Sequence, residues 1–305
     1  MDYILETENL SKKYGRKRAL DNVSIHVEQG DIYGLVGRNG AGKTTLMKIV
    51  CGLTRKSGGS YSIFGKGDRE VGAVMQRVGL LIESPGYFEE FDALTNLKMK
   101  CSLLGIRGEE EPKRLLKLIG LEEAGKKKAK NFSLGMKQRL GIGIALAGSP
   151  DIVVLDEPIN GLDPEGIIEI RDMIKNMNRE NGTTFIISSH ILDELSKIAT
   201  KYGIINYGKL VEETTAQDMF AKCESRIELV TDNSSAAVAI LEKIGFSKIR
   251  VKESGRIYIY EQFERTGDIS LALASQGVTV LEIFKKLETV EKYYMRLVDS
   301  PIAEE

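Results

Sequence analysis

The sequence predicts an α/β protein with a parallel sheet, followed by a small α+β domain. A glycine-rich loop at residues 37–45 lies between an apolar strand and a helical pattern. Farther along, apolar runs at 151–156 and 183–188 flank a helical segment from 164 to 180, a spacing that implies parallel strands joined by right-handed crossovers. After about residue 221 the patterns follow the order βαββαβ, which suggests a ferredoxin-like arrangement.

Length, charge and cysteine usage narrow the class of protein. At 305 residues the chain favours about two domains. A formal net charge of −1 gives no reason to expect a nucleic-acid partner. No apolar stretch approaches the ~18 residues that span a bilayer, and residues 1–8 lack the pattern of a signal peptide. Because Cys51, Cys101 and Cys223 are widely separated, we expect reduced thiols in a cytoplasmic protein.

Apolar residues recur at strand spacing before the glycine-rich loop and at helical spacing in a segment after it. In the first thirty residues Val23, Ile25 and Val27 alternate with polar neighbours, which is typical of strands with one buried face. From about residue 88 to 149 apolar residues recur at helical spacing. This pattern indicates a helical insertion within the α/β domain.

The glycine-rich loop fits the spacing G-x-x-x-x-G-K-[ST] of a phosphate-binding loop. Its glycines let successive backbone N–H groups and the following helix N-terminus point at one anion. Lys43 would reach the terminal phosphates, and the Thr44 hydroxyl would hold magnesium. The expected phosphate-binding residues are Gly37, Asn39, Gly40, Gly42, Lys43, Thr44 and Thr45.

Two carboxylates follow a buried strand, at the edge where open α/β sheets bind ligands. The apolar run at 152–155 leads directly into Asp156 and Glu157. We expect Asp156 to contact magnesium and Glu157 to act as the base for an attacking water. His190 ends another apolar strand, where an imidazole could bond the γ-phosphate of a nucleotide.

A further motif, Asn131-Phe-Ser133-Leu-Gly135-Met-Lys-Gln138-Arg139, opens a helix. Taken with the phosphate loop, Asp156-Glu157, Asn160-Gly-Leu-Asp163 and His190, it resembles the nucleotide-binding subunit of ATP-binding cassette (ABC) transporters. The motifs occur in the family's order between residue 4 and about residue 220. The resemblance implies a P-loop NTPase core of mixed sheet at 1–220, a helical subdomain at about 88–149, and an accessory domain at 225–305.

The resemblance also implies that two such subunits close head to tail over two ATP molecules. In this family each site combines the phosphate loop of one subunit with the signature segment of the other. Ser133, the Gly135 N–H and the helix that follows would face the partner's γ-phosphate. Gln138 belongs to the same segment, and Asp163 matches the loop that crosses the dimer. Tyr14 occupies the position where the family stacks an aromatic ring on adenine, although a merely exposed tyrosine is the alternative.

Some positions depart from the commoner family pattern. The signature has Leu134 and Met136 where glycines are usual. Where a glutamine usually contacts magnesium, this chain has Glu83, whose carboxylate can also ligate the metal; the alternative is that Gln76 fills this role. With the C-terminal domain, Glu83 and the run Ser-Ser-His-Ile-Leu-Asp-Glu make the chain similar to the bacitracin-resistance and lantibiotic-immunity branch of exporters.

The resemblance implies an ATPase subunit that uses ATP and Mg²⁺ to power export of a peptide antibiotic, a lantibiotic or a similar amphiphile. In this family the substrate contacts belong to a separate membrane permease. We expect a second ATPase subunit, identical or related, and a peripheral position on the inner face of the membrane. The segment from Ser84 to Phe91 is where the family docks its permease. One alternative is a soluble ABC ATPase acting on ribosomes or DNA, but these usually carry two cassettes or a long coiled coil. Another is a regulatory module without turnover, which an intact Glu157 and His190 argue against.

Overall fold

The computed structural model describes residues 3–83, 86–223, 225–252, 254–286 and 288–299. Ser84 and Pro85, at the start of the segment expected to dock a permease, lie outside the described residues. The chain divides into two compact units, Met1–Ala216 and Gln217–Glu305. Each unit has its own buried apolar cluster.

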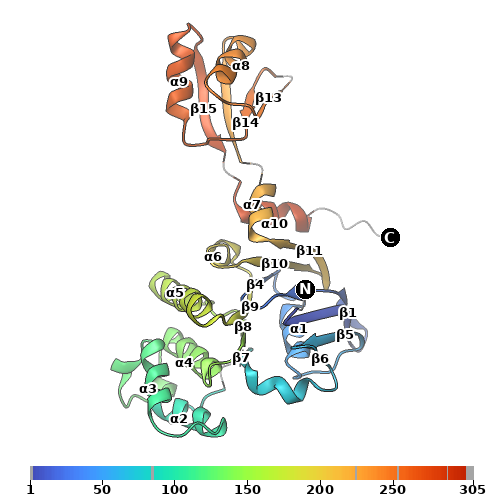
Figure 1. Ribbon diagram of the computed structural model, residues 1–305, viewed down its shortest axis with the longest axis vertical. Helices are drawn as coiled ribbons and strands as arrows, with labels where there is room; N and C mark the ends of the chain where they lie inside the picture. Colours follow the sequence, from blue (N-terminus) through green and yellow to red (C-terminus); the bar gives the residue numbers. More distant parts are fainter. Residues whose placement is uncertain (1–2, 84–85, 224, 253, 287, 300–305) are drawn as a thin grey trace. The chain divides into compact units, whose positions relative to one another are not determined.

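The first unit is organised around a six-stranded sheet (Figure 1). Its strands are β4 (Ile32–Val36), β7 (Val78–Leu81), β8 (Ile152–Asp156), β9 (Thr184–Ser189), β10 (Lys201–Asn206) and β11 (Lys209–Thr215). They lie in the order β11-β10-β4-β9-β8-β7, and every pair is parallel except β10 with β11. All residues of β4 and β9 are buried, which agrees with the continuous apolar runs of a sheet covered on both faces. The predicted α/β fold with parallel pairing is confirmed.

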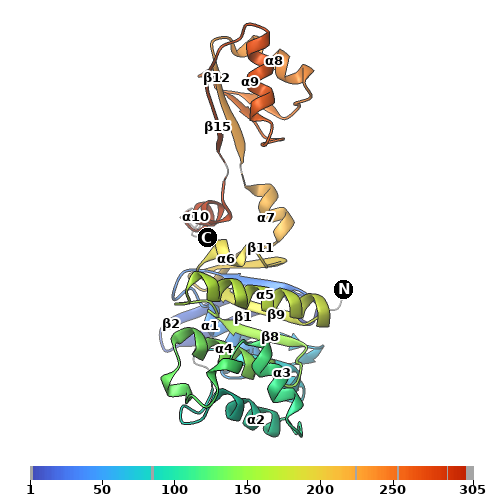
Figure 2. The same cartoon turned by 90° about the vertical axis from the view of Figure 1, so that its left-hand side faces the viewer.

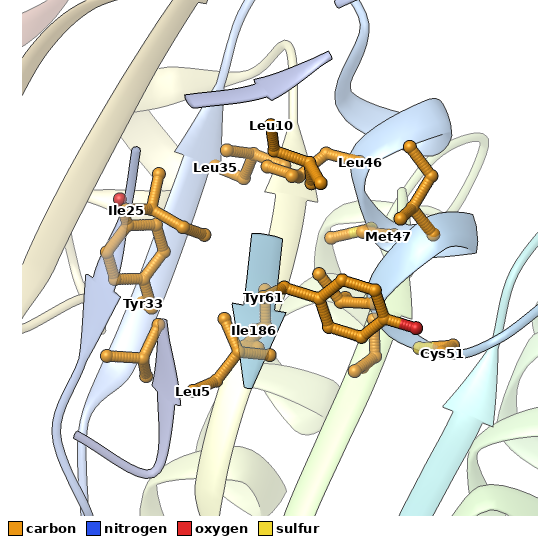
Figure 3. Packing of buried hydrophobic residues seen from close by; sticks show 14 of the residues in the cluster. Leu5, Leu10, Ile25, Tyr33, Leu35, Leu46, Met47, Cys51, Tyr61 and Ile186 are labelled. Atoms are coloured by element: carbon orange, nitrogen blue, oxygen red, sulfur yellow. The ribbon is translucent and has the colours of Figure 1, made fainter. Parts of the chain in front are cut away.

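A second, antiparallel sheet packs against the first. Its strands are β1 (Leu5–Tyr14), β2 (Lys17–Val23), β3 (His26–Val27), β5 (Gly58–Ile63) and β6 (Lys66–Gly67). Val23, Ile25 and Val27 are all buried, as their alternation predicts. Figure 3 shows Leu5 and Leu10 of this sheet meeting Leu35 and Ile186 of the parallel sheet. The two sheets thus share one core, from which the carboxyl ends of the parallel strands emerge.

Helices follow the parallel strands β4, β8 and β9. They are α1 (Lys43–Val50), α5 (Pro164–Asn181) and α6 (Leu192–Leu195), and a 3₁₀ helix, η1 (Val71–Arg77), precedes β7. The start of α5 is set by Asp163, whose side chain accepts a hydrogen bond of 3.0 Å from the Gly166 N–H. The helix ends at Gly182, whose φ of 66° suits glycine. Because α1 directly follows the loop after β4, its N-terminus lies at the carboxyl edge of the sheet.

The predicted helical insertion forms a group of helices at one end of the first unit (Figure 2). It contains α2 (Ala93–Leu103), α3 (Glu110–Leu118) and α4 (Leu134–Leu146), with short 3₁₀ turns η2 (Glu122–Ala124) and η3 (Ala129–Asn131). Ser133 caps α4 by accepting a hydrogen bond of 3.3 Å from the Met136 N–H. The signature segment therefore lies at a helix N-terminus, where backbone N–H groups are unpaired within the helix.

The second unit has the element order βαββαβ between two flanking helices. Its elements are α7 (Ala216–Lys222), β12 (Arg226–Thr231), α8 (Ser234–Lys243), β13 (Ile249–Val251), β14 (Ile257–Ile259), α9 (Thr266–Ser275), β15 (Val280–Lys286) and α10 (Val290–Asp299). The strands form an antiparallel sheet in the order β13-β14-β12-β15. Ile227 and Leu229 join α8 and α9 in an apolar core, so Glu228 between them faces the other side of the sheet. Among the described residues, no helix is long and apolar enough to cross a membrane.

Candidate active site

The phosphate loop connects β4 to α1 and depends on glycine at two positions for different reasons. Gly42 has a φ of 114°, and a Cβ there would lie 2.7 Å from the backbone oxygen of Ala19. At Gly37 the obstacle is space, since a Cβ would lie 2.4 Å from the backbone oxygen of Ile205. Helix α1 has no side-chain cap at its N-terminus. Its first N–H groups are therefore available to an anion.

Lys43 is buried and points back along the loop rather than into solvent. Its side chain is only 6% exposed, and its Nζ donates a hydrogen bond of 2.7 Å to the Gly37 oxygen. The same Nζ lies 3.2 Å from Oε1 of Glu157, without the geometry of a hydrogen bond. The strand edge thus brings the predicted phosphate-binding cation and the predicted base together.

Asp156 ends β8 and has both carboxylate oxygens engaged. Thr44 Oγ1 donates a hydrogen bond of 2.7 Å to Oδ2. Ser188 Oγ donates one of 2.5 Å to Oδ1. The structure therefore brings together the two predicted metal-contacting residues, Thr44 and Asp156. Sequence reasoning did not assign a role to Ser188, and its signal was a hydroxyl at the end of a run of buried apolar residues.

Glu157 follows β8 in a left-handed backbone conformation, with a φ of 50°. Its N–H donates a hydrogen bond of 2.9 Å to Ser188 Oγ, and its Oε2 lies 2.7 Å from Nδ1 of His190. A non-glycine residue with positive φ is uncommon and often occurs at functional sites. The turn directs the Glu157 carboxylate toward both Lys43 and His190, so two predicted catalytic residues are in direct contact.

The signature residues line a separate surface cavity of about 630 Å³. Ser133, Gly135 and Asp163 are among its lining residues, whereas no residue of the phosphate loop is. Gln138 also stands outside the lining. Among the described residues, this cavity therefore contains signature residues but none from the phosphate loop.

Tyr14 and Glu83 lie outside the contacts described so far. Tyr14 ends β1 with 49% of its surface exposed, and Lys12 Nζ lies 4.7 Å from the centre of its ring. Glu83 has a side chain that is 61% exposed, and its Oε1 lies 2.5 Å from Nζ of Lys48 in the last turn of α1. The structure thus places the Glu83 carboxylate on Lys48 rather than with Thr44 and Asp156. Its predicted role as a magnesium ligand stays a prediction.

Comparisons with known proteins agree with this arrangement. Residues 20–160 match the family model described as ABC transporter. The chain is 38% identical to an uncharacterized ABC transporter ATP-binding protein, YcbN of Bacillus subtilis, with 98% of both chains covered. It is 37% identical to the bacitracin transport ATP-binding protein BcrA of Enterococcus faecalis, covering 98% of this chain and 97% of BcrA.

Two further comparisons cover about two thirds of the chain. The chain is 43% identical to the lantibiotic transport ATP-binding protein SrtF of Streptococcus pyogenes, over 69% of this chain and 90% of SrtF. The fold matches a dimeric ATP-binding cassette solved in a post-hydrolysis state with ADP and Pi, at 24% identity and a TM-score of 0.63, with 70% of this chain and 98% of that chain covered. The full-length likeness to YcbN and BcrA, together with the site, shows that this chain is an ATP-binding, ATP-hydrolysing subunit of the ABC transporter family.

Proposed function

We propose that this chain powers the export of a peptide antibiotic, a lantibiotic or a similar amphiphile through a separate membrane permease. The observation that carries the proposal is the contact of Glu157 with both Lys43 and His190 at the end of β8. This arrangement has the residues needed to hold a γ-phosphate beside a base. The likeness to BcrA over nearly the whole of both chains supports the choice of cargo class.

ATP binding is assigned to the phosphate loop. The loop residues from Gly37 to Thr45 would surround the phosphates with backbone N–H groups, and Lys43 would supply the balancing charge. The oxygen atoms that Lys43 contacts, those of Gly37 and Glu157, support this assignment, because a phosphate would offer the ammonium group the same kind of partner. Exposed Tyr14 is assigned to stacking on adenine, because an aromatic face close to a lysine can bind an electron-rich ring on its free side.

A magnesium ion would be held by Thr44 and Asp156. The two side chains are already 2.7 Å apart, and hydroxyl and carboxylate oxygens are the donors that Mg²⁺ prefers. When bound, the ion would neutralise phosphate charge. Among the described residues, no cluster of three or more histidine, cysteine or acidic side chains offers a competing metal site. Glu83 would join the metal only by leaving Lys48.

Hydrolysis is assigned to Glu157 as the base that accepts a proton from water. His190 Nδ1 lies 2.7 Å from Oε2, which leaves Oε1 as the oxygen that faces Lys43. Once Lys43 binds phosphate in place of Glu157, Oε1 becomes available to water. His190 would hold the carboxylate in this orientation and bond the γ-phosphate with its other nitrogen.

We further propose that two ATPase subunits, identical or related, close over ATP. The support is the separation of the signature cavity, which contains Ser133, Gly135 and Asp163, from the phosphate loop. A second copy or a related chain would bring its own signature segment, including Gln138, to this chain's phosphates. The solved cassette that matches the fold is itself a dimer with ADP and Pi.

The permease is assigned to the loop before α2, which would hold the chain on the inner face of the membrane. Phe88 and Phe91 are 57% and 41% exposed, and their ring centres lie 6.2 Å apart. The buried amide of Asn96 holds the loop through bonds to the N–H and oxygen of Phe88. A rigid pair of exposed aromatic rings is typical of a protein contact. The second unit is assigned the role of an accessory domain.

The proposal is tested in a strain that lacks the chain but keeps its cognate permease. Complementation with the wild type should raise the concentration of bacitracin or of a lantibiotic that inhibits growth, whereas complementation with Lys43→Ala should not. Susceptibility to an unrelated cytoplasmic antibiotic is the control. Affinity purification from membranes should recover an integral membrane protein. Equal susceptibility in all strains, with ribosomes or DNA as the recovered partner, would reject the proposal.

A further inference from the structure

Ser188 contacts both acidic residues of the site, Asp156 and Glu157, through its Oγ. It is a fully buried residue of β9 and pairs with Asp156 in the neighbouring strand β8. Its Oγ accepts a hydrogen bond of 2.9 Å from the Glu157 N–H and donates one of 2.5 Å to Asp156 Oδ1. A hydroxyl has one proton and two lone pairs. The proton is directed at Asp156, and a lone pair at Glu157.

The hydrogen bond from Ser188 to Asp156 orients a carboxylate that is proposed to contact the metal. Asp156 accepts from Thr44 through Oδ2 and from Ser188 through Oδ1. With only one of these donors the carboxylate could rotate about its terminal torsion, which is a broad one. With both donors in place, Oδ2 faces Thr44 at the start of α1. Ser188 therefore determines which oxygen is presented to the metal.

The hydrogen bond from the Glu157 N–H to Ser188 supports the turn that presents the proposed base. Glu157 has a φ of 50°, a region that residues with a Cβ adopt at a cost. The Glu157 N–H is the first backbone donor after β8 ends, and Ser188 Oγ is its partner. In this turn the carboxylate meets Lys43 and His190. Loss of the bond would free the backbone to relax and move the base.

We infer that Ser188 is a positioning residue for ATP hydrolysis, whose single buried hydroxyl aligns Asp156 and Glu157 relative to each other. The inference rests on the roles proposed for those two residues. It adds that the proposed metal ligand and the proposed base depend on one common partner for their relative geometry. A general base works only from a defined distance and direction, so a small loss of alignment costs rate more than it costs binding.

The experiment compares purified full-length chains carrying Ser188→Ala or Thr184→Val. Thr184 is the matched control, because it is a fully buried residue at the other end of β9. Its Oγ1 accepts a hydrogen bond of 2.9 Å from the Gly30 N–H. Both changes remove one buried hydroxyl from the same strand. The readouts are kcat and KM for ATP, the Mg²⁺ concentration for half-maximal rate, the affinity for a fluorescent ATP analogue with EDTA, and the thermal midpoint.

For Ser188→Ala we expect kcat to fall about tenfold or more while KM changes less than about threefold, the pattern of a lost transition-state contact. The Mg²⁺ requirement should rise, and binding of the analogue in EDTA should be unchanged. Thr184→Val should lower the thermal midpoint similarly and keep the kcat of the wild type. Ser188→Cys keeps a donor at this position, although a larger and weaker one, and should give an intermediate kcat. It also serves as the test variant if Ser188→Ala does not fold.

Two results would overturn the inference. One is a kcat for Ser188→Ala, or for Ser188→Cys in its place, equal to that of the wild type. The other is an equal loss of kcat in Thr184→Val, which would make the effect one of stability. Glu157→Gln is measured in parallel. If Glu157→Gln stalls hydrolysis and the Ser188 variants do not, only the inference fails; if Glu157→Gln hydrolyses ATP normally, the proposed roles fail with it.

Discussion

Nζ of Lys43 lies 3.2 Å from Oε1 of Glu157, so the cation of the phosphate loop and the base at the end of β8 neutralise each other. If Lys43 binds the γ-phosphate as proposed, the phosphate has to displace Glu157 from the lysine. Under this proposal, ATP binding would also expose the Glu157 carboxylate, because one ammonium group cannot hold both anions with the same geometry.

Replacement of Lys43 by alanine should weaken ATP binding by about tenfold or more, equal to about 1.4 kcal/mol. The loop would lose its buried cation, and the Glu157 carboxylate would repel the phosphates without a counter-charge. Titration with a fluorescent ATP analogue measures the effect. Lys66→Ala, which changes an exposed lysine in β6, should bind as the wild type does. An affinity for Lys43→Ala within a few-fold of the wild type would show that the loop does not depend on this cation.

Glu157→Gln should bind ATP and hydrolyse it about 100-fold more slowly or worse, since the amide cannot accept the proton from water. We expect this variant to become dimeric with ATP, whereas the wild type without nucleotide stays mostly monomeric. Size-exclusion chromatography with and without ATP gives the answer. A monomer under saturating ATP would argue against closure through Ser133 and Gly135 of a second subunit.

Glu83 offers a test of the metal assignment. Glu83→Gln keeps the shape, weakens a metal contact and eases repulsion of phosphate, so ATP affinity should change little while transport falls more than the ATPase rate. Glu83→Ala should lower both. The exposed ion pair with Lys48 contributes about 0.5 kcal/mol or less, so stability should not obscure the result. If Glu83→Ala is silent and Gln76→Ala impairs both activities, Gln76 fills the role instead.

Asn96 tests the proposed permease contact without altering any exposed residue. Asn96 is 3% exposed, and its Oδ1 accepts a hydrogen bond of 2.7 Å from the Phe88 N–H. Its Nδ2 donates hydrogen bonds to the backbone oxygens of Phe88 and Asp92. Asn96→Asp removes the donor and should cost about 2 kcal/mol of stability. Transport should be lost while the isolated subunit keeps its ATPase rate. Transport equal to the wild type, with the loop released, would contradict the assignment of this surface.

In the second unit, Glu228 should make stability depend on acidity. Burial raises the pKa of this carboxyl, but hydrogen bonds from Arg256 and Arg226 outweigh burial and leave the pKa below its ordinary value of 4.5. A lowered pKa in the folded state stabilises the fold at pH values above the ordinary pKa. This stability is lost as the pH falls through the lowered pKa. Glu228→Gln should therefore cost about 2 kcal/mol at pH 7 and much less in acid.

Thermal unfolding of the full chain at pH 7 and at acidic pH measures the Glu228 effect. The control is Glu282→Gln, because Glu282 lies on the same face and also pairs with Arg256 but has a side chain that is 54% exposed. The control should change stability by about 0.5 kcal/mol or less at either pH. Equal effects of the two changes would show that burial of Glu228 has no special consequence.

Local sequence patterns were enough to predict the fold class and the family, and they also predict which residues carry chemistry. The reason is that each motif depends on local patterns: glycine spacing at residues 37–45, an apolar run ending in Asp156 and Glu157, and a helix start after Ser133. The periods of the β8, α5 and β9 segments also implied parallel pairing, which the structure has between β8 and β9. These features require no knowledge of distant contacts.

Which side chains meet follows from long-range contacts that local sequence patterns do not reveal. Ser188 stands 32 residues after Asp156 in the chain, and nothing in its local pattern shows that one hydroxyl serves both Asp156 and the Glu157 backbone. The parallel register of β8 and β9 places it there. Glu83 shows the converse, since family position predicted a metal ligand while the positive φ after β7 brings its carboxylate to Lys48. Register and backbone turns set these distances, because parallel strands distant in sequence end at one shared edge.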